Sequence, residues 1–223
     1  NPRVKKRPNL GRHRQAKTEA EANQAIRVLM ANVQSIGNKL DEIDALCKVH
    51  KIDVVCLTET WTTQKDRDCS ITMPGFFVVS RFDKDTSTGI GGGNLILARN
   101  GINIVNVDHL DNCNAGSSVQ ATTAEIIGSH FNISLINIYR SPSKTTEEKS
   151  IKEVTEIFRK AKGNTIIVGD VNFPEIDFVA LETKSYAGTN RQRCSQFLDV
   201  FKEKGFEQRV ETPTRFHSLE KYQ

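Results

Sequence analysis

The fold is decided by the stretch Thr165-Ile166-Ile167-Val168-Gly169-Asp170-Val171-Asn172-Phe173-Pro174. A short apolar run that ends at Gly169 is typical of a strand covered on both faces. In open α/β sheets, ligands bind just past the carboxyl ends of such strands, which makes Asp170 and Asn172 candidate functional residues. Their side chains point the same way if the chain stays extended between them. Gly-Asp and Asn-x-Pro also end ordinary strands, so this stretch alone fits a plain turn equally well.

The first ordered part of the chain predicts a strand, a helix and a second strand. Residues 26–31 are mostly apolar and end at Asn32, residues 36–49 carry an apolar stripe at helical spacing, and a second mostly apolar run over residues 52–57 leads to Glu59. This is the pattern of a βαβ unit with a right-handed crossover. If the two strands are parallel neighbours, Asn32 and Glu59 share one sheet edge. A lone Glu after a strand is usually solvated, but with an Asn beside it the pair is a reasonable ligand set for Mg²⁺.

The middle of the chain is rich in β-strand signals. The expected strands are residues 76–80, 94–98, 102–107, 119–127 and 132–139. Residues 89–93 hold four glycines but lack the Gly-Lys-Ser/Thr of a phosphate-binding loop, and we expect a hairpin or bulge there. Tyr139 and Arg140 end a strand together. Because Arg can grip phosphate in a bidentate manner, this pair suits a phosphodiester, although it also fits a buried Tyr beside a surface Arg.

Two amphipathic helices are expected in the last third of the chain. The first runs from Thr145 to Ala161, with a capping box at its start. The second carries its apolar stripe over residues 194–201 and ends before Gly205. Residues 206–210 have the composition of one more strand.

Composition separates a basic leader from the rest of the chain. Residues 1–18 hold seven Lys and Arg and no acidic residue, while the remaining residues hold 24 basic and 27 acidic side chains. We therefore expect residues 1–25 to be a basic, disordered leader, in which Lys5-Lys6-Arg7-Pro8 also fits a nuclear-import or nucleic-acid-binding arm. The five cysteines are far apart and form no CxxC pair, which favours a reduced, intracellular protein without a zinc site. No apolar run is long enough for a membrane span.

Polar residues thus follow four predicted strand ends, and the sequence motifs around them are distinctive. The stretches that carry it are 30–35 with Lys39, 57–61, 74–76, 91–93, 138–142, 168–174 and 212–215. Their order and spacing resemble the endonuclease/exonuclease/phosphatase superfamily, to which DNase I and the apurinic/apyrimidinic endonucleases belong. The finer wording is similar to the endonuclease domain of LINE-type, non-LTR retrotransposons. The resemblance spans about residues 26 to 216.

The resemblance implies an α/β fold, a four-layer sandwich of two mixed β-sheets packed face to face with helices outside. It implies one such domain over residues 26–223 that lacks its last strands. The implied activity is Mg²⁺-dependent nicking of DNA to leave a 3′-hydroxyl that primes reverse transcription, with Mn²⁺ as an alternative metal. The implied partners are DNA and a reverse-transcriptase domain in the same polypeptide. Glu59 would bind the metal, and Asn32 would help to hold the metal or the phosphate.

The other roles follow position by position. By this resemblance Tyr139 contacts the scissile phosphate and Arg140 lies close by. Asp170 orients or deprotonates the attacking water, and Asn172 stabilises charge on the phosphoryl oxygens. These roles agree with the chemistry, because developing phosphoryl charge calls for a cation and aimed donors, and the water calls for a carboxylate.

The sequence departs from the family pattern at its C-terminus. The family completes its site with a Ser/Asp-His pair that follows the region of residues 212–215, with a further Asp on a preceding strand. His217 comes too soon after that motif and has no acid before it, and the other histidines lie in no matching motif. Loss of such a group typically lowers the rate by ~10²–10⁴-fold, so we expect these 223 residues alone to be weakly active or inactive.

Two alternatives remain open. One is another hydrolase of the same fold that acts on RNA, a phosphoinositide or a phosphomonoester. The other is a catalytically dead remnant that binds nucleic acid through its basic leader, in a salt-dependent way that Asp170→Ala does not change.

Overall fold

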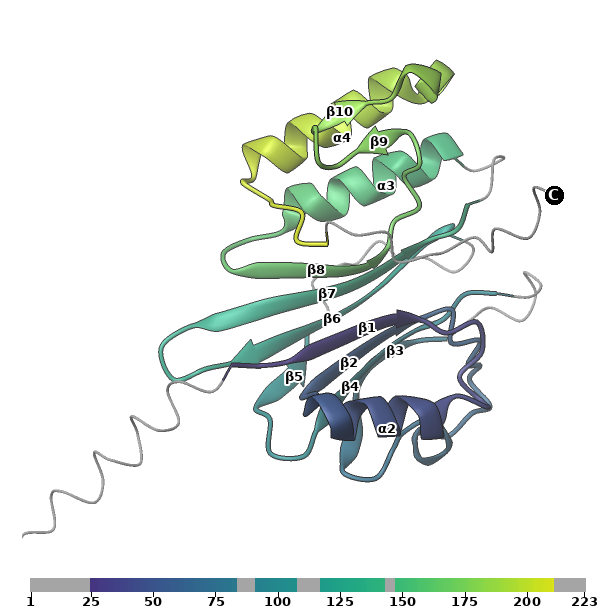
Figure 1. Cartoon of the computed structure of the whole chain (residues 1–223), viewed down its shortest axis with the longest axis vertical. Coiled ribbons are helices and arrows are strands. Elements are labelled where there is room, and N and C mark those ends of the chain that lie inside the picture. The colour runs from purple at the N-terminus through teal and green to yellow at the C-terminus, as the bar shows by residue number, and fades with distance from the viewer. Residues whose placement is uncertain (1–24, 84–90, 108–116, 143–146, 211–223) are drawn as a thin grey trace, which may run out of the picture.

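The computed structural model describes residues 25–83, 91–107, 117–142 and 147–210. Within them lie ten strands and three α-helices (Figure 1). The strands are β1 (Val28–Asn32), β2 (Val54–Thr58), β3 (Phe76–Phe82), β4 (Asn94–Arg99), β5 (Ile104–Asn106), β6 (Val119–Ile127), β7 (Asn132–Arg140), β8 (Thr165–Asp170), β9 (Ile176–Asp177) and β10 (Glu182–Thr183). The helices are α2 (Leu40–His50), α3 (Glu147–Lys160) and α4 (Arg191–Glu203), with short 3₁₀ turns at Asp68–Ser70 and Ser185–Asn190. The expected basic leader, the capping Thr145 and the 212–215 motif lie outside the described residues.

The main strands form two four-stranded mixed sheets. The first has the order β1-β2-β4-β3, in which β1 and β2 are parallel and the other pairs are antiparallel. The second has the order β5-β6-β7-β8, in which only β7 and β8 are parallel. The parallel pairing of β1 with β2 across α2 is the βαβ unit that the sequence predicts.

Alternation along the strands divides the apolar residues among three core layers. In β2, Val54 and Cys56 face the second sheet, while Val55 and Leu57 face α2. In β7, Leu135 faces the first sheet, while Ile136 and Ile138 point to the opposite face of the strand and pack against α3 and α4. Both sheets are therefore covered on both faces, and the four-layer sandwich is confirmed (Figure 1).

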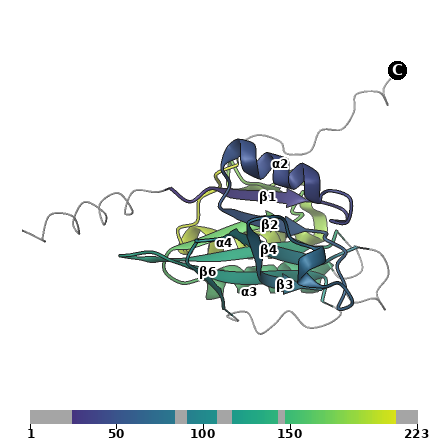
Figure 2. The same ribbon diagram turned by 90° about the horizontal axis from the view of Figure 1, so that it is seen from below.

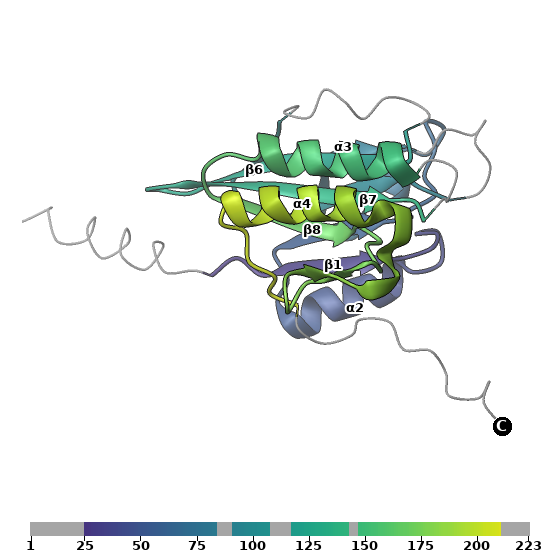
Figure 3. The same ribbon diagram turned by 90° about the horizontal axis from the view of Figure 1, so that it is seen from above.

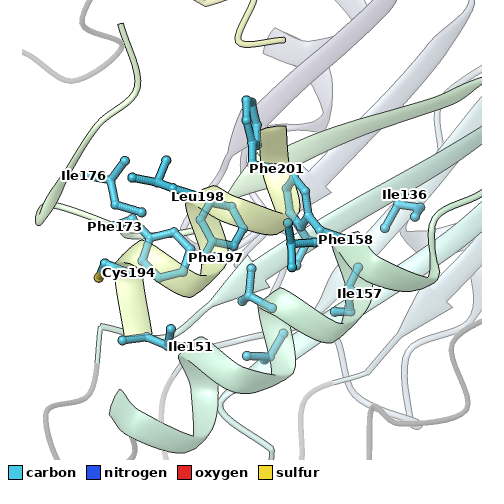
Figure 4. Close-up of a cluster of buried hydrophobic side chains, with 14 residues drawn as sticks. Ile136, Ile151, Ile157, Phe158, Phe173, Ile176, Cys194, Phe197, Leu198 and Phe201 are labelled. Carbon is cyan, nitrogen blue, oxygen red and sulfur yellow. The ribbon is translucent and has the colours of Figure 1, made fainter. Parts of the chain in front are cut away.

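The helices lie on the two outer faces. Seen from below, α2 crosses the first sheet beside β1 and β2 (Figure 2). Seen from above, α3 and α4 lie side by side over the second sheet (Figure 3). Their buried faces hold a group of aromatic rings centred on Phe197, whose ring lies 5.0 Å from that of Phe158 and 4.8 Å from that of Phe173 (Figure 4). Within the described ranges, no helix is long and apolar enough to cross a membrane.

The strand expected over residues 206–210 is a wrong prediction. Helix α4 ends at Glu203, and Gly205, two residues later, has a positive φ of 70° and reverses the chain. Phe206 then donates its backbone N–H to the Phe201 carbonyl at 3.0 Å and packs its ring against Phe158. The apolar side chain that suggested a strand instead completes the helical core.

Candidate active site

The layer between the two sheets changes from apolar to polar toward one end. Its apolar part includes Val54, Ile96 and Leu135. Nearer the carboxyl ends of β1, β2, β7 and β8, the inward positions are occupied by Asn94 and Asn137, which are fully buried. The Asn137 amide donates to the Leu57 carbonyl at 2.8 Å, and so links the two sheets just below this end.

Asn32 and Asp170 meet across the two sheets at this polar end. Asn32 is the last residue of β1, and Asp170 is the last residue of β8. The Asn32 Nδ2 donates to Asp170 Oδ2 at 3.3 Å. Two residues that are 138 positions apart in the sequence thus bring together an amide and a carboxylate.

Glu59 follows β2 directly and is held by two N–H donors. Trp61 Nε1 and the Gly92 backbone N–H each donate to Glu59 Oε2 at 2.8 Å. Both Glu59 and Trp61 have left-handed backbone conformations, with φ of 57° and 59°. A left-handed conformation at two non-glycine residues costs free energy, and such strain is concentrated at functional sites.

Tyr139 lies close to the carboxylates of Glu59 and Asp170. It pairs with Asp170 in the parallel register of β7 and β8, and only 6% of its surface is exposed. Burial, then a hydrogen bond with Glu59 and its charge, and finally the charge of Asp170 raise the pKa of Tyr139, against a smaller lowering by Ser141. The phenol is therefore protonated at neutral pH, which makes it a hydrogen-bond donor rather than a base.

Asn172 lies beside this cluster, but not in the extended conformation assumed from its spacing. Its φ is 46°, and its backbone N–H donates to Asp170 Oδ1 at 3.2 Å, which forms a tight turn. Its Nδ2 donates to the Arg140 carbonyl at 2.7 Å. The turn that the Asn-x-Pro sequence indicates is present, and it carries Asn172 back toward the end of β7.

Arg140 is not brought to the site by the structure. The guanidinium is buried, with 2% of the side chain exposed, and lies on the opposite face of β7 from Tyr139. Its Nε donates to Ser150 Oγ at 2.8 Å, its Nη1 donates to the Asn172 carbonyl at 2.5 Å, and its Cζ lies 4.8 Å from the centre of the Phe173 ring. Direct phosphate binding by Arg140 would require it to leave these partners, so the geometry makes it a support of the Asn172 turn.

The gathered donors fit a hard divalent cation. Glu59 and Asp170 supply carboxylate oxygens, and Asn32 supplies an amide oxygen, since its nitrogen is turned toward Asp170. Within the parts of the chain that the structure covers, no three His, Cys, Asp or Glu side chains gather into a metal cluster. Mg²⁺ commonly uses one or two carboxylates with water and substrate phosphate, so this small donor set is compatible with it.

Comparisons with known proteins point to one fold. A family model described as endonuclease-reverse transcriptase matches residues 133–222. The endonuclease domain of TRAS1, a telomere-specific non-LTR retrotransposon, superposes with a TM-score of 0.55 at 17% identity, covering 83% of this chain and 75% of that one. An AP endonuclease from Archaeoglobus fulgidus gives 0.53 at 18% identity, covering 81% of this chain and 70% of that one.

The chain has the DNase I-like fold. A 3′-5′ exonuclease from Neisseria meningitidis shares this fold, with a TM-score of 0.55 at 20% identity over 78% of this chain and 70% of that one. No curated protein matches the sequence. The resemblance to the endonuclease/exonuclease/phosphatase superfamily is thus confirmed at the level of the DNase I-like fold, with the family-model match over the second half of the chain in agreement.

Three groups around the candidate site receive no role from the sequence. Trp61 and the Gly92 N–H hold the Glu59 carboxylate, and Gln120 Oε1 accepts the Gly93 N–H at 2.7 Å. The sequence predicts a hairpin or bulge at the glycine run, and the structure gives Gly91, Gly92 and Gly93 positive φ values. Trp61 stands two residues after Glu59 in the distinctive stretch 57–61, which is a signal that could have found it. No sequence signal marks Gln120.

Proposed function

We propose that this chain is a Mg²⁺-dependent DNA endonuclease that hydrolyses one phosphodiester bond and leaves a 3′-hydroxyl. We further propose that it belongs to a retrotransposon-derived polypeptide that also holds a reverse transcriptase. The observation that carries the proposal is the convergence of Asn32, Glu59, Tyr139 and Asp170 from four strand ends of two sheets. The DNase I-like fold and the family-model match support it.

The metal would be held by Glu59 with help from Asn32. When bound, Mg²⁺ supplies positive charge that stabilises the negative charge developing on the phosphoryl oxygens. The chain's own donors act on the same oxygens. Tyr139 is protonated at neutral pH and donates its O–H to a phosphoryl oxygen.

Asp170 is the group that orients and deprotonates the attacking water. Its Oδ1 accepts the Asn172 N–H and its Oδ2 accepts the Asn32 amide, so the carboxylate is fixed by donors from both sheets. A carboxylate fixed in this way can orient a water molecule and accept its proton as the water oxygen attacks phosphorus. The bond from phosphorus to the 3′ oxygen breaks, the leaving oxygen takes a proton from solvent water, and the products are a 3′-hydroxyl and a 5′-phosphate.

The substrate is tested with a panel offered to the chain in Mg²⁺. The panel contains a supercoiled plasmid, a duplex with one abasic site, a 3′-phosphorylated oligonucleotide and a single-stranded RNA. We expect nicking of the plasmid, with ends that a DNA polymerase extends without prior phosphatase treatment, since a 3′-hydroxyl is a primer. Turnover of only the RNA or the 3′-phosphate would instead favour another hydrolase of this fold. Salt-dependent DNA binding without any cleavage would favour a remnant.

A further inference from the structure

The turn that carries Glu59 is joined to a run of three glycines. Gly91, Gly92 and Gly93 have φ values of 112°, 86° and 92°, a region that favours glycine. The Thr60 N–H donates to the Gly93 carbonyl at 3.1 Å, and the Trp61 N–H donates to the Gly92 carbonyl at 2.9 Å. The Glu59 turn and the glycine run therefore hold each other in place beyond the paired ends of β2 and β4.

Side chains at these glycines would crowd the groups around Glu59. A Cβ at Gly93 would lie 2.4 Å from Thr60 Oγ1, and one at Gly92 would lie 2.7 Å from Gln120 Nε2. A Cβ at Gly91 would lie 3.3 Å from Glu59 Oε2 itself. The glycines thus allow the backbone to approach the carboxylate closely enough for the Gly92 N–H to donate to it.

As a result, one oxygen of the Glu59 carboxylate is held by hydrogen bonds. Glu59 Oε2 accepts two N–H groups at 2.8 Å, one from the Trp61 indole and one from the Gly92 backbone. Trp61 is 36% exposed, so it lies at the surface beside the site. Carboxylates that ligate metals are commonly fixed by such partners, and removal of a partner typically lowers metal affinity by about 10–100-fold.

We propose that Trp61 and the Gly92 N–H are positioning groups for the candidate metal ligand Glu59, and that Trp61 reports on cation binding there. The inference rests on the proposed metal-dependent function, and it adds to that function the residues that orient the ligand before the cation arrives. By fixing Oε2, the two donors set the direction of the whole carboxylate. Less ordering is then required when the cation binds, which raises its affinity.

The test is a Mg²⁺ titration of the intact chain with two readouts. Calorimetry measures the dissociation constant, and tryptophan emission reports locally because Trp61 is the single Trp of the sequence. We expect the emission to change saturably, with the midpoint found by calorimetry. In Glu59→Gln, we expect no saturable change.

Trp61→Phe keeps a ring but removes the indole N–H. We expect the calorimetric dissociation constant for Mg²⁺ to rise about 10–100-fold. The variant should also nick DNA more slowly than the parent, and high Mg²⁺ should restore part of the nicking rate. Phe77→Leu is the matched control, because Phe77 is equally exposed at 36% but lies in β3, where it pairs with Ala98 of β4 rather than with the Glu59 turn. This control should bind Mg²⁺ like the parent chain.

The outcomes separate this inference from the proposed function. If the parent binds Mg²⁺ and Trp61→Phe binds it equally well, the positioning role is overturned while the proposed function stands. A lower melting temperature of Trp61→Phe without a change in its Mg²⁺ dissociation constant would show a purely structural role and would also overturn it. If the parent binds no Mg²⁺, both the inference and the metal-dependent function fail.

Discussion

Arg140 and Tyr139 are neighbours in the sequence, yet they serve opposite faces of β7. Residues of one parity in this strand, such as Leu135 and Asn137, face the other sheet, and Tyr139 shares that parity. Arg140 has the other parity and faces α3, where it donates to Ser150. Since side chains alternate along a strand, a consecutive Tyr-Arg pair at a strand end is not expected to converge on one substrate. The opposite orientation of Tyr139 and Arg140 could therefore be predicted from the sequence, because consecutive strand residues point to opposite faces of the sheet.

Arg140 is expected to matter for stability. We predict that Arg140→Lys lowers the free energy of unfolding by about 2–4 kcal/mol. An ammonium cannot reach Ser150 Oγ and the Asn172 carbonyl together, so at least one buried polar group loses its hydrogen-bond partner. Chemical denaturation of both proteins measures this difference. Arg159→Lys is the matched control, since Arg159 is exposed at the end of α3 and pairs with Glu156 on the surface of the same helix. An equal effect of both substitutions would contradict the role of Arg140 as a support of the Asn172 turn.

Tyr139 provides a prediction of pH dependence. Its pKa in the folded chain is raised, first by burial and then by Glu59. An unfolded tyrosine ionises near pH ~10. The folded form therefore holds its proton more tightly, and the stability that Tyr139 contributes is lost as the pH rises above about 10.

Tyrosinate absorbance near 295 nm tests this prediction. Up to about pH 10.5, the folded parent and folded Tyr139→Phe should give the same absorbance per molecule, whereas in denaturant the parent should gain one further tyrosinate. An excess of tyrosinate in the folded parent over the variant below that pH would mean that Tyr139 ionises normally. The raised pKa of Tyr139, and the pH dependence of stability that follows from it, would then be wrong.

At the scale of elements, the strands and helices could largely be predicted. The run of residues 119–127 became β6 without change, and the stripe of residues 194–201 became the buried face of α4. Both segments have strongly periodic apolar residues, and burial of the apolar face stabilises the element that this period predicts. The Glu59 turn could not be predicted, because its left-handed residues are stabilised by a glycine run more than thirty residues away.

The cover of α3 and α4 depends on Phe197. This ring is fully buried and contacts the rings of Phe158, Phe173, Phe178 and Phe201. We predict that Phe197→Ala lowers the free energy of unfolding by about 3–5 kcal/mol, since it opens a cavity among rings that cannot close it. Phe131→Ala, at a position that is 59% exposed, should change it by less than about 1 kcal/mol. Urea denaturation distinguishes the two, and similar losses would contradict the assigned core.

For the whole molecule, the site lies where the layer between the sheets turns polar. Asn32 and Asp170 share the inward parity of Val28 and Val168, which pack in the apolar part of that layer. The sequence predicts these strand ends but not which sheet each strand joins, because long-range pairing decides that. A polar cluster at the strand ends was therefore predictable, whereas the specific contact of Asn32 with Asp170 was not.

Asn137 tests the connection between the sheets. Its amide donates to the Leu57 carbonyl at 2.8 Å and is fully buried. We predict that Asn137→Ala lowers the free energy of unfolding by about 1–3 kcal/mol, because that carbonyl loses its donor. Asn132→Ala, at the exposed start of the same strand, is the control and should have little effect. Thermal denaturation compares them, and a neutral Asn137→Ala would show that the sheets do not rely on this bond.

The central claim is that four strand ends form one phosphodiesterase site, and the rate of plasmid nicking tests it most directly. The parent chain, Asp170→Asn, Glu59→Ala and the control Asp177→Asn are compared with protein in excess over DNA, with and without Mg²⁺. We expect slow Mg²⁺-dependent nicking by the parent, reduced at least about 100-fold in Asp170→Asn and Glu59→Ala and unchanged in Asp177→Asn, whose carboxylate caps the exposed turn after β9. Nicking that survives both site substitutions, or that needs no divalent cation, would contradict the account.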